Sequence, residues 1–279
     1  NGKRRARVLW VSTPPSFYSA VIGMQSWTKK NGNRPQKNHQ KKPVQYLPDA
    51  TGSLHIIEVL RINKTFDQIP VLKVITFYIR NKEFITFFGP SGCGKTTLAR
   101  ALYGAVDSTL SIIEGKVCYH FGDQKYELSP NGNDLKNIWW ERISYIPQGS
   151  LSALNPVRRL RDIFSDLANS HGKTFDEQKV KDHLEMVNLP SYVLRIYPFE
   201  LSGGMRQRCV IALATFLKPD VIIADEPTGN LDSKTGESII GLLKELNRTE
   251  RVTVILVTHV KNISQKTDRI ITLVDGKNV

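Results

Sequence analysis

The stretch "EFITFFGPSGCGKTTLARALYG" (83–104) decides the fold, because it combines a strand, a glycine-rich loop and a helix in that order. The short apolar run 83–89 predicts a buried strand, and residues 96–104 are predicted to form the following helix. Between them, "GPSGCGKT" (89–96) fits G-x-x-x-x-G-K-[ST] at every fixed position. A chance glycine-rich turn is the alternative, and the flanking strand and helix argue against it. The sequence therefore predicts a phosphate-binding loop in an α/β protein.

The glycines, the lysine and the threonine of this loop each have an expected role in binding phosphate or metal. Its glycines let the backbone turn so that N–H groups and the helix N-terminus converge on phosphate oxygens. Lys95 is expected to reach the β and γ phosphates, and the hydroxyl group of Thr96 to coordinate Mg²⁺. We interpret Cys93 as a small residue that fills the loop and not as a catalytic thiol. The residues predicted to bind the nucleotide here are Gly89, Ser91, Gly92, Cys93, Gly94, Lys95, Thr96 and Thr97.

Two adjacent acids follow the apolar residues of "DVIIADE" (220–226). A buried parallel strand is a continuous apolar run, and it delivers the next residues to the carboxyl end of the sheet, where ligands bind. We therefore expect Asp225 to hold Mg²⁺ through water and Glu226 to polarise the attacking water. A strand that ends in two solvated acids is the alternative, and the phosphate loop favours the functional interpretation.

Single polar side chains end two further apolar strands. The stretch "RISYIPQ" (142–148) ends at Gln148, and "VTVILVTH" (252–259) ends at His259. Gln148 is a candidate for contact with Mg²⁺ and water, and His259 for contact with the γ-phosphate. Such residues are more often simply exposed, but their positions beside the inferred site favour a role.

The order of predicted elements indicates an α/β fold: a P-loop NTPase core with a mainly parallel sheet and helices, an antiparallel β subdomain and an inserted α-helical lobe at about 150–205. The helical spacing of Val180, Leu184 and Val187 places one helix of the lobe at 176–189. Further strands are predicted at 55–62, 71–79, 116–121 and 125–129, and further helices at 203–217 and 233–247.

The formal net charge of +13 is distributed unevenly. Residues 1–50 contain 10 Lys or Arg and 1 acid, whereas residues 51–279 contain 29 basic and 25 acidic side chains. Because "WTKKNGNRPQKNHQKK" (27–42) is also poor in apolar residues, we interpret residues 1–53 as a basic, flexible segment and 54–279 as the folded domain. The near-neutral core gives no reason to expect a nucleic-acid partner.

Signals for export, membrane insertion and cysteine chemistry are weak in this sequence. Residues 3–23 resemble a signal peptide, but "TPPS" (13–16) interrupts the apolar part. No apolar run is long enough to span a bilayer. The three cysteines show no paired spacing, which favours a reducing compartment and argues against a cysteine-bound metal.

Together these motifs resemble those of the nucleotide-binding subunits of ATP-binding cassette (ABC) transporters. The resemblance covers about residues 54–278 and includes, in the family's order, the phosphate loop, the Q-loop residue Gln148, the signature "LSGGM" (201–205), the "IIADEP" strand, the D-loop residues Leu231 and Asp232 and the switch residue His259. It implies an ATPase that binds ATP and Mg²⁺. It also implies that Phe66 stacks on adenine, whereas Phe66 taken alone would be assigned to the core.

The resemblance also explains why one chain has two glycine-rich elements. It implies that two subunits pair head to tail, so that the signature of one caps the γ-phosphate held by the loop of the other. Ser202 and the N–H groups of Gly203 and Gly204 would then form a second anion-binding helix N-terminus. Met205 and Asp232 complete the set of residues expected to meet the partner's nucleotide.

A narrower resemblance, to the ATPases of dipeptide, oligopeptide and nickel importers, lies in "QGSLSALNPVRRL" (148–160) and "YPFELSGGMRQR" (197–208). It implies a peripheral subunit on the cytoplasmic face of the cell membrane, working with a solute-binding protein and a second ATPase subunit, identical or homologous. Membrane-spanning permease subunits would dock near Gln148 and between Ala153 and Pro156. Three features depart from this branch. Val260 replaces the acid that usually follows the switch histidine, and the sequence ends at "LVDGKNV" without the typical C-terminal extension. The basic segment 1–50 has no counterpart in the branch.

Two other classes of protein remain as alternatives. A non-transport ABC ATPase that acts on nucleic acid or in cofactor assembly would use the basic segment 1–53 as its anchor, whereas "SALNP" (152–156) favours an importer. A small-molecule P-loop kinase would need no signature motif, so "LSGGM" argues against it.

Overall fold

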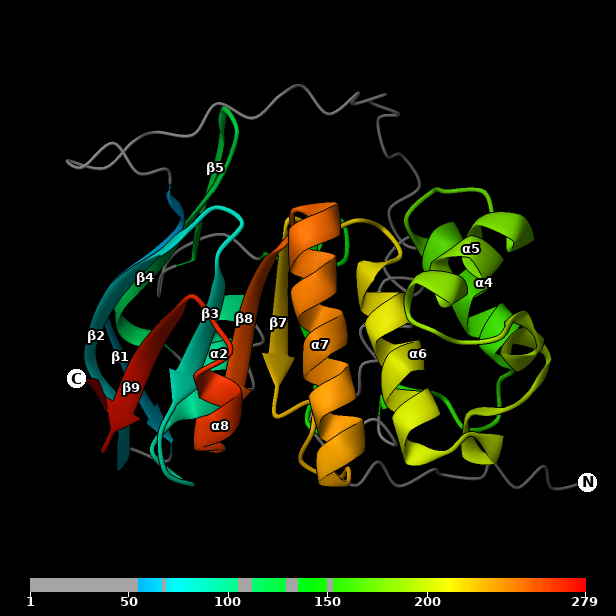
Figure 1. The fold of residues 1–279 in the computed structure, drawn as a ribbon. Helices are drawn as coiled ribbons and strands as arrows, with labels where there is room; N and C mark the ends of the chain where they lie inside the picture. The colour runs from blue at the N-terminus through cyan, green and yellow to red at the C-terminus, as the bar shows by residue number, and fades with distance from the viewer. Residues whose placement is uncertain (1–54, 67–68, 105–111, 129–134, 150–152) are drawn as a thin grey trace, which may run out of the picture.

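Figure 1 shows the computed structural model, which describes residues 55–66, 69–104, 112–128, 135–149 and 153–279. It contains two β-sheets and, beyond one edge of the larger sheet, a group of short helices. The interpretation of residues 1–53 as a flexible basic segment lies outside the described residues. Within the described ranges, no helix is both long enough and apolar enough to cross a membrane.

The central sheet has the strand order β10-β9-β3-β8-β7-β6. All neighbouring pairs are parallel except β9 and β10. Every residue of β7 and β8 is buried, which explains why these strands are near-continuous apolar runs in the sequence. Because parallel strands end at the same edge, the segments after β3, β6, β7 and β8 meet there. The strands are β3 (Phe84–Phe88), β6 (Ile143–Ile146), β7 (Val221–Asp225), β8 (Thr253–Thr258), β9 (Arg269–Val274) and β10 (Lys277–Asn278).

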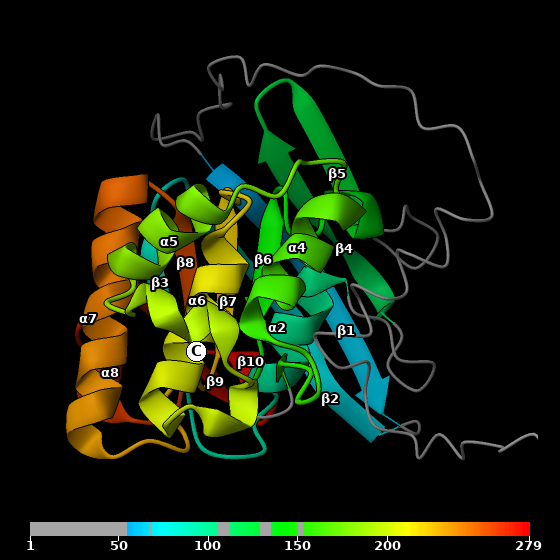
Figure 2. The same cartoon turned by 90° about the vertical axis from the view of Figure 1, so that its right-hand side faces the viewer.

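A second, antiparallel sheet has the order β2-β1-β4-β5, with β1 (His55–Phe66), β2 (Ile69–Arg80), β4 (Ile112–Phe121) and β5 (Gln124–Leu128). Helix α2 (Lys95–Tyr103) lies between the two sheets and packs on β2 and on β6, β7 and β8. Figure 2 shows α7 (Ser233–Glu250) and α8 (Lys261–Ser264) on the opposite face of the central sheet. These layers bury one continuous apolar core.

Between β6 and β7 the chain is mainly helical. Helices α4 (Leu160–Ser170) and α5 (Glu177–Met186) are followed by two 3₁₀ turns, η2 (Ser191–Arg195) and η3 (Pro198–Glu200). Helix α6 (Gly203–Thr215) then returns to the central sheet, where it packs on β6 and α7. A further 3₁₀ turn, η1 (Leu135–Ile138), precedes β6.

The predicted fold class is confirmed: a mainly parallel sheet with helices, an antiparallel sheet and a helical insertion after β6. The sequence does not predict α4, α8, β9 or β10 as separate elements. Strand β6 ends at Ile146 and not at Gln148, because Pro147 has no N–H to donate to a neighbouring strand. Gln148 therefore follows the strand in a loop.

Candidate nucleotide-binding site

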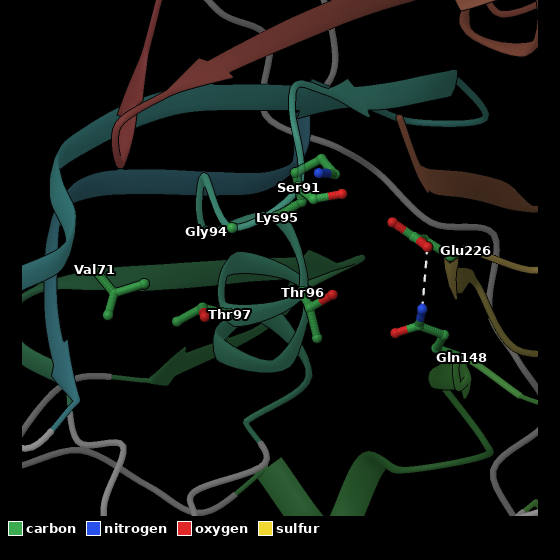
Figure 3. A pocket seen from close by; sticks show the side chains of 9 residues that line it. Val71, Ser91, Gly94, Lys95, Thr96, Thr97, Gln148 and Glu226 are labelled. Carbon is green, nitrogen blue, oxygen red and sulfur yellow. Dashed lines mark hydrogen bonds between the residues drawn. The ribbon is translucent and has the colours of Figure 1, made fainter. Parts of the chain in front are cut away.

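An open cavity of about 270 Å³ lies where the loop after β3 passes into α2. Figure 3 shows that its side chains come from β2, from this loop, from the start of α2 and from the segments after β6 and β7. The lining residues are Val71, Ser91, Gly92, Gly94, Lys95, Thr96, Thr97, Gln148 and Glu226. Residues predicted from three separate stretches of sequence therefore meet in one place.

The backbone of the loop depends on two glycines. Gly94 has a φ of 100°, which suits glycine, and it begins α2 with no side chain to cap the helix. A Cβ on Gly89 would lie 2.2 Å from the carbonyl oxygen of Leu273, so the end of β3 can approach β9 this closely only without a side chain. The first N–H groups of a helix have no hydrogen-bond partner within the helix. In α2 these groups belong to residues that line the cavity, so they are available to a bound phosphate.

The ammonium group of Lys95 is held inside the loop, where the residue is 4% exposed. Its Nζ donates to the carbonyl oxygen of Pro90 at 2.8 Å and lies 3.9 Å from Sγ of Cys93. An ammonium group has three N–H donors, so Nζ can also donate to a phosphate in the cavity. Cys93 is buried and does not line the cavity, which fits a residue that fills the loop.

The carboxylate of Asp225, the last residue of β7, is held at both oxygens. Oδ1 accepts a hydrogen bond from Oγ1 of Thr96 at 3.0 Å, and Oδ2 accepts one from Oη of Tyr145 at 2.7 Å. Burial raises the pKa of the Asp225 carboxyl above its usual range, and the hydrogen bonds from Tyr145 and Thr96 oppose that rise. Thr96 can donate its proton to Asp225 while its oxygen binds a cation.

Glu226 directly follows Asp225, and its side chain lines the cavity. Its φ is 44°, in the left-handed region that few non-glycine residues adopt, and its N–H donates to the carbonyl oxygen of Val257 at 3.0 Å. Oε2 accepts a hydrogen bond from Nε2 of Gln148 at 3.1 Å (Figure 3), and Oε1 lies 3.1 Å from Nδ1 of His259. A carboxylate positioned in this way at the cavity can accept a proton from water.

These residues fit a nucleoside triphosphate with Mg²⁺. The uncapped N-terminus of α2 and Lys95 supply N–H donors and positive charge for phosphates. Thr96, Asp225 and Gln148 carry the oxygen atoms that Mg²⁺ prefers as ligands. In the part of the chain that the structure describes, no group of three or more His, Cys, Asp or Glu side chains could hold a metal ion. Mg²⁺ bound beside Thr96 would take further ligands from substrate phosphates and water.

The residues predicted to meet a partner's nucleotide do not line this cavity: Ser202, Gly203, Gly204, Met205 and Asp232. Oγ of Ser202 caps α6 by accepting from the N–H of Met205 at 3.3 Å. Oδ1 of Asp232 caps α7 by accepting from the N–H of Thr235 at 3.0 Å. Hydrogen bonds from the side chain and from the N–H of Thr235 lower the pKa of Asp232. A Cβ on Gly204 would lie 2.7 Å from Cγ2 of Thr235, so the two helices begin in close contact. Within one chain, the signature is thus separate from the phosphate loop.

Two further predicted features are not brought into the cavity. Phe66 is the last residue of β1, paired with Ile69, and its side chain lies outside the described part, so its stacking on adenine stays a prediction. In the segment predicted to dock a membrane partner, Ala153 is buried and Pro156 is exposed, and the neighbouring Val157 is 77% exposed. The partner of this segment also stays a prediction.

Three neighbours of the site are not identified from the sequence. Val71 lines the cavity, and Tyr145 contacts Asp225, but both lie in strands where they look like ordinary packing residues. Arg100 is a charged neighbour of Tyr145 and Asp225. Its only signal in the sequence is its position four residues after Thr96, on the same face of the predicted helix.

Comparisons with known proteins agree with this geometry. A family model described as ABC transporter matches residues 72–229. The dipeptide transport ATP-binding protein DppD of Caldanaerobacter subterraneus is 37% identical over 190 residues, which are 66% of this chain and 57% of that protein. The chain therefore spans little more than half the length of this relative. The uncharacterized ABC transporter ATP-binding protein MJ0796 of Methanocaldococcus jannaschii is 34% identical over 230 residues, 80% of this chain and 94% of that protein.

A solved structure supports the same grouping. The dimeric structure of a post-hydrolysis state of the ATP-binding cassette MJ0796, bound to ADP and Pi, matches this chain with a TM-score of 0.67 at 31% identity. The match covers 80% of this chain and 96% of that chain.

Proposed function

The chain is a member of the ABC transporter family, and on that premise we propose that it binds ATP with Mg²⁺ and hydrolyses the ATP to power import across a membrane. One observation carries the proposal: the phosphate loop, Thr96 with Asp225, and the carboxylate of Glu226 meet at one cavity. The state of MJ0796 bound to ADP and Pi supports it, because that relative is similar over most of both chains.

The polar groups at the cavity divide the reaction between them. The first N–H groups of α2 and Nζ of Lys95 bind the β and γ phosphates. Thr96, Asp225 and Gln148 would hold Mg²⁺, which would neutralise charge on these phosphates. Glu226 accepts a proton from water as the water oxygen attacks the γ-phosphorus and the bond to the ADP oxygen breaks.

The side chains that contact Glu226 orient it for this proton transfer. Gln148 contacts one carboxylate oxygen and His259 the other, so the carboxylate cannot turn without losing a partner. Because His259 contacts the carboxylate that lines the cavity, we expect it to sense whether the γ-phosphate is present.

We also propose that each ATP lies between two subunits. A second helix N-terminus, formed by Ser202, Gly203 and Gly204, does not line the cavity of the same chain. A phosphate bound at this N-terminus would therefore belong to a nucleotide held in the cavity of another subunit. The dimeric structure of MJ0796 supports such pairing. The second subunit is a copy of this chain or a homologous ATPase.

The relatives support peptides as the solute. DppD is named for dipeptide transport, and an oligopeptide transport ATP-binding protein, OppD of Lactococcus lactis, is 33% identical over 190 residues. We propose residues 54–279 as the ATPase domain, with a helical lobe at about 150–205. It would act at the cytoplasmic face of the membrane with a solute-binding protein, and permease subunits would dock near Gln148 and between Ala153 and Pro156.

Phosphate release by the purified chain with ATP and Mg²⁺ tests the proposed reaction. Lys95→Ala removes the buried ammonium group of the loop, and the proposal predicts loss of hydrolysis. Lys179→Ala is the matched control, because it makes the same change at a side chain that is 79% exposed on α5. Hydrolysis that survives Lys95→Ala would contradict the proposal. ATP-dependent peptide uptake by vesicles containing the permease partners then tests the transport role.

A further inference from the structure

The hydroxyl group of Tyr145 is placed against the carboxylate of Asp225 from the side opposite to Thr96. Oη of Tyr145 lies 2.7 Å from Oδ2, and Oγ1 of Thr96 lies 3.0 Å from Oδ1. One donor belongs to β6 and the other to α2. The carboxylate, on a residue that is 1% exposed, therefore cannot rotate about its Cβ–Cγ bond without losing both hydrogen bonds.

The position of Tyr145 is fixed by contacts that do not involve Asp225. Its ring centroid lies 5.2 Å from that of Tyr103, which in turn stacks on Trp139 at 4.7 Å with an angle of 7° between the rings. Nε1 of Trp139 donates to the carbonyl oxygen of Tyr103 at 2.8 Å. In the sheet, Tyr145 is paired with Ile223, two residues before Asp225. The hydroxyl group is thus a donor whose place is set before any ligand binds.

We propose that Tyr145 is a positioning residue for Asp225, whose hydroxyl keeps Oδ2 turned towards β6 and Oδ1 beside Thr96, where the cation binds. This inference rests on the proposed function, which places Mg²⁺ at Thr96 and Asp225. Groups that orient a metal-binding carboxylate typically change metal affinity when they are removed, although they never touch the ion. Tyr145 therefore contributes to binding of the metal and not to binding of the nucleotide itself.

The test is a Mg²⁺ titration of a fluorescent ATP analogue bound to the full chain, repeated with Tyr145→Phe. This change removes the hydroxyl group and retains the ring that packs on Tyr103. We expect the Mg²⁺ concentration at half-saturation to rise by about 10-fold, the lower end of the range for such orienting groups. Affinity for the analogue in excess chelator should stay within about twofold of the parent, because the phosphate loop is unchanged.

Tyr119→Phe is the matched control. Tyr119 is fully buried, and its hydroxyl donates to the carbonyl oxygen of Leu102. Tyr119→Phe therefore also removes a buried tyrosine hydroxyl, but one that does not contact Asp225. We expect no change in its Mg²⁺ titration. Should Tyr145→Phe lower affinity in chelator as well, Tyr145→Met carries the same test, because methionine also lacks a hydroxyl.

Two results would overturn the inference, and they are distinguishable. A parent chain whose affinity for the analogue does not respond to Mg²⁺ would overturn the proposed function and this inference with it. A parent that responds to Mg²⁺, with an unchanged or lower half-saturation in Tyr145→Phe or an equal rise in Tyr119→Phe, would overturn this inference alone.

Discussion

Nδ1 of His259 lies 3.1 Å from Oε1 of Glu226, although 33 residues separate them in the sequence. The same carboxylate receives a hydrogen bond from Gln148 at its other oxygen, at 3.1 Å. Side chains that follow β6, β7 and β8 are therefore connected through one carboxylate at the cavity. This connection makes Glu226 the residue from which the proposed chemistry is most easily tested.

Glu226→Gln should retain binding of ATP with Mg²⁺ and lose turnover by roughly 10²–10⁴-fold, the range for removal of a general base. The amide has the size of the carboxylate but does not accept a proton from water at neutral pH. Steady-state phosphate release and nucleotide binding measure the two effects separately. Glu237→Gln is the control, because it makes the same change at a side chain that is 67% exposed on α7. Turnover of Glu226→Gln within threefold of the parent would exclude Glu226 as the base.

The contact between Gly204 and Thr235 predicts a rescue by a second substitution. Gly204→Ala places a Cβ 2.7 Å from Cγ2 of Thr235 and should lower the free energy of unfolding by about 1–2 kcal/mol, as overpacking does. Thr235→Ser removes that methyl group and retains the N–H that Asp232 caps, so the double variant should recover most of the loss. Chemical denaturation measures both steps. Equal destabilisation of the single and double variants would show that the clash is not with Thr235.

His183 should make the stability of the chain fall in acid. Burial lowers the pKa of this imidazole below its usual value, and its Nε2 lies 2.7 Å from Oγ1 of Thr215. The unfolded chain therefore binds the proton more readily, and the free energy of unfolding is greatest above about pH 6.5 and falls at lower pH, by at most about 1.4 kcal/mol per pH unit for this group.

Denaturation of the parent and of His183→Gln between pH 5 and pH 8 isolates this contribution, since the other titrating groups are common to both. The difference in free energy of unfolding between the two should be constant above about pH 6.5 and shrink below it. A difference that does not change with pH would contradict the assignment to His183.

Some features of the site could be predicted from the sequence because they are local. The loop from Gly89 to Thr96 is identified by its spacing together with the strand before it and the helix after it, all within about 20 residues. The apolar run of β7 predicts a strand buried on both faces, which excludes charged side chains from its interior. Asp225 and Glu226, which end this run, are therefore placed at the carboxyl edge of the sheet. Such features need no knowledge of distant contacts.

Other features depend on contacts between distant parts of the chain. The left-handed backbone of Glu226, which aims its side chain differently from that of Asp225, is set by a hydrogen bond to β8. Tyr145 resembles a packing residue until β6 is placed beside β7. Strand β9 pairs with β3, from which about 180 residues separate it, so its place cannot be derived from its own composition.

The central claim is that the phosphate loop and the signature of one chain serve different nucleotides. Lys95→Ala and Ser202→Arg should each inactivate the chain, since one removes the ammonium group and the other fills the N-terminus of α6. A mixed dimer of the two contains one site with both defects and one site with none. Random pairing of equal amounts should leave about one quarter of the sites intact.

The decisive measurement is therefore steady-state phosphate release by the two variants, alone and mixed. Partial recovery of ATP hydrolysis in the mixture is the predicted result, because only a site shared between two chains can be rebuilt from two defective ones. A mixture that is shown to contain the mixed dimer and still hydrolyses no more ATP than the separate variants would contradict the account.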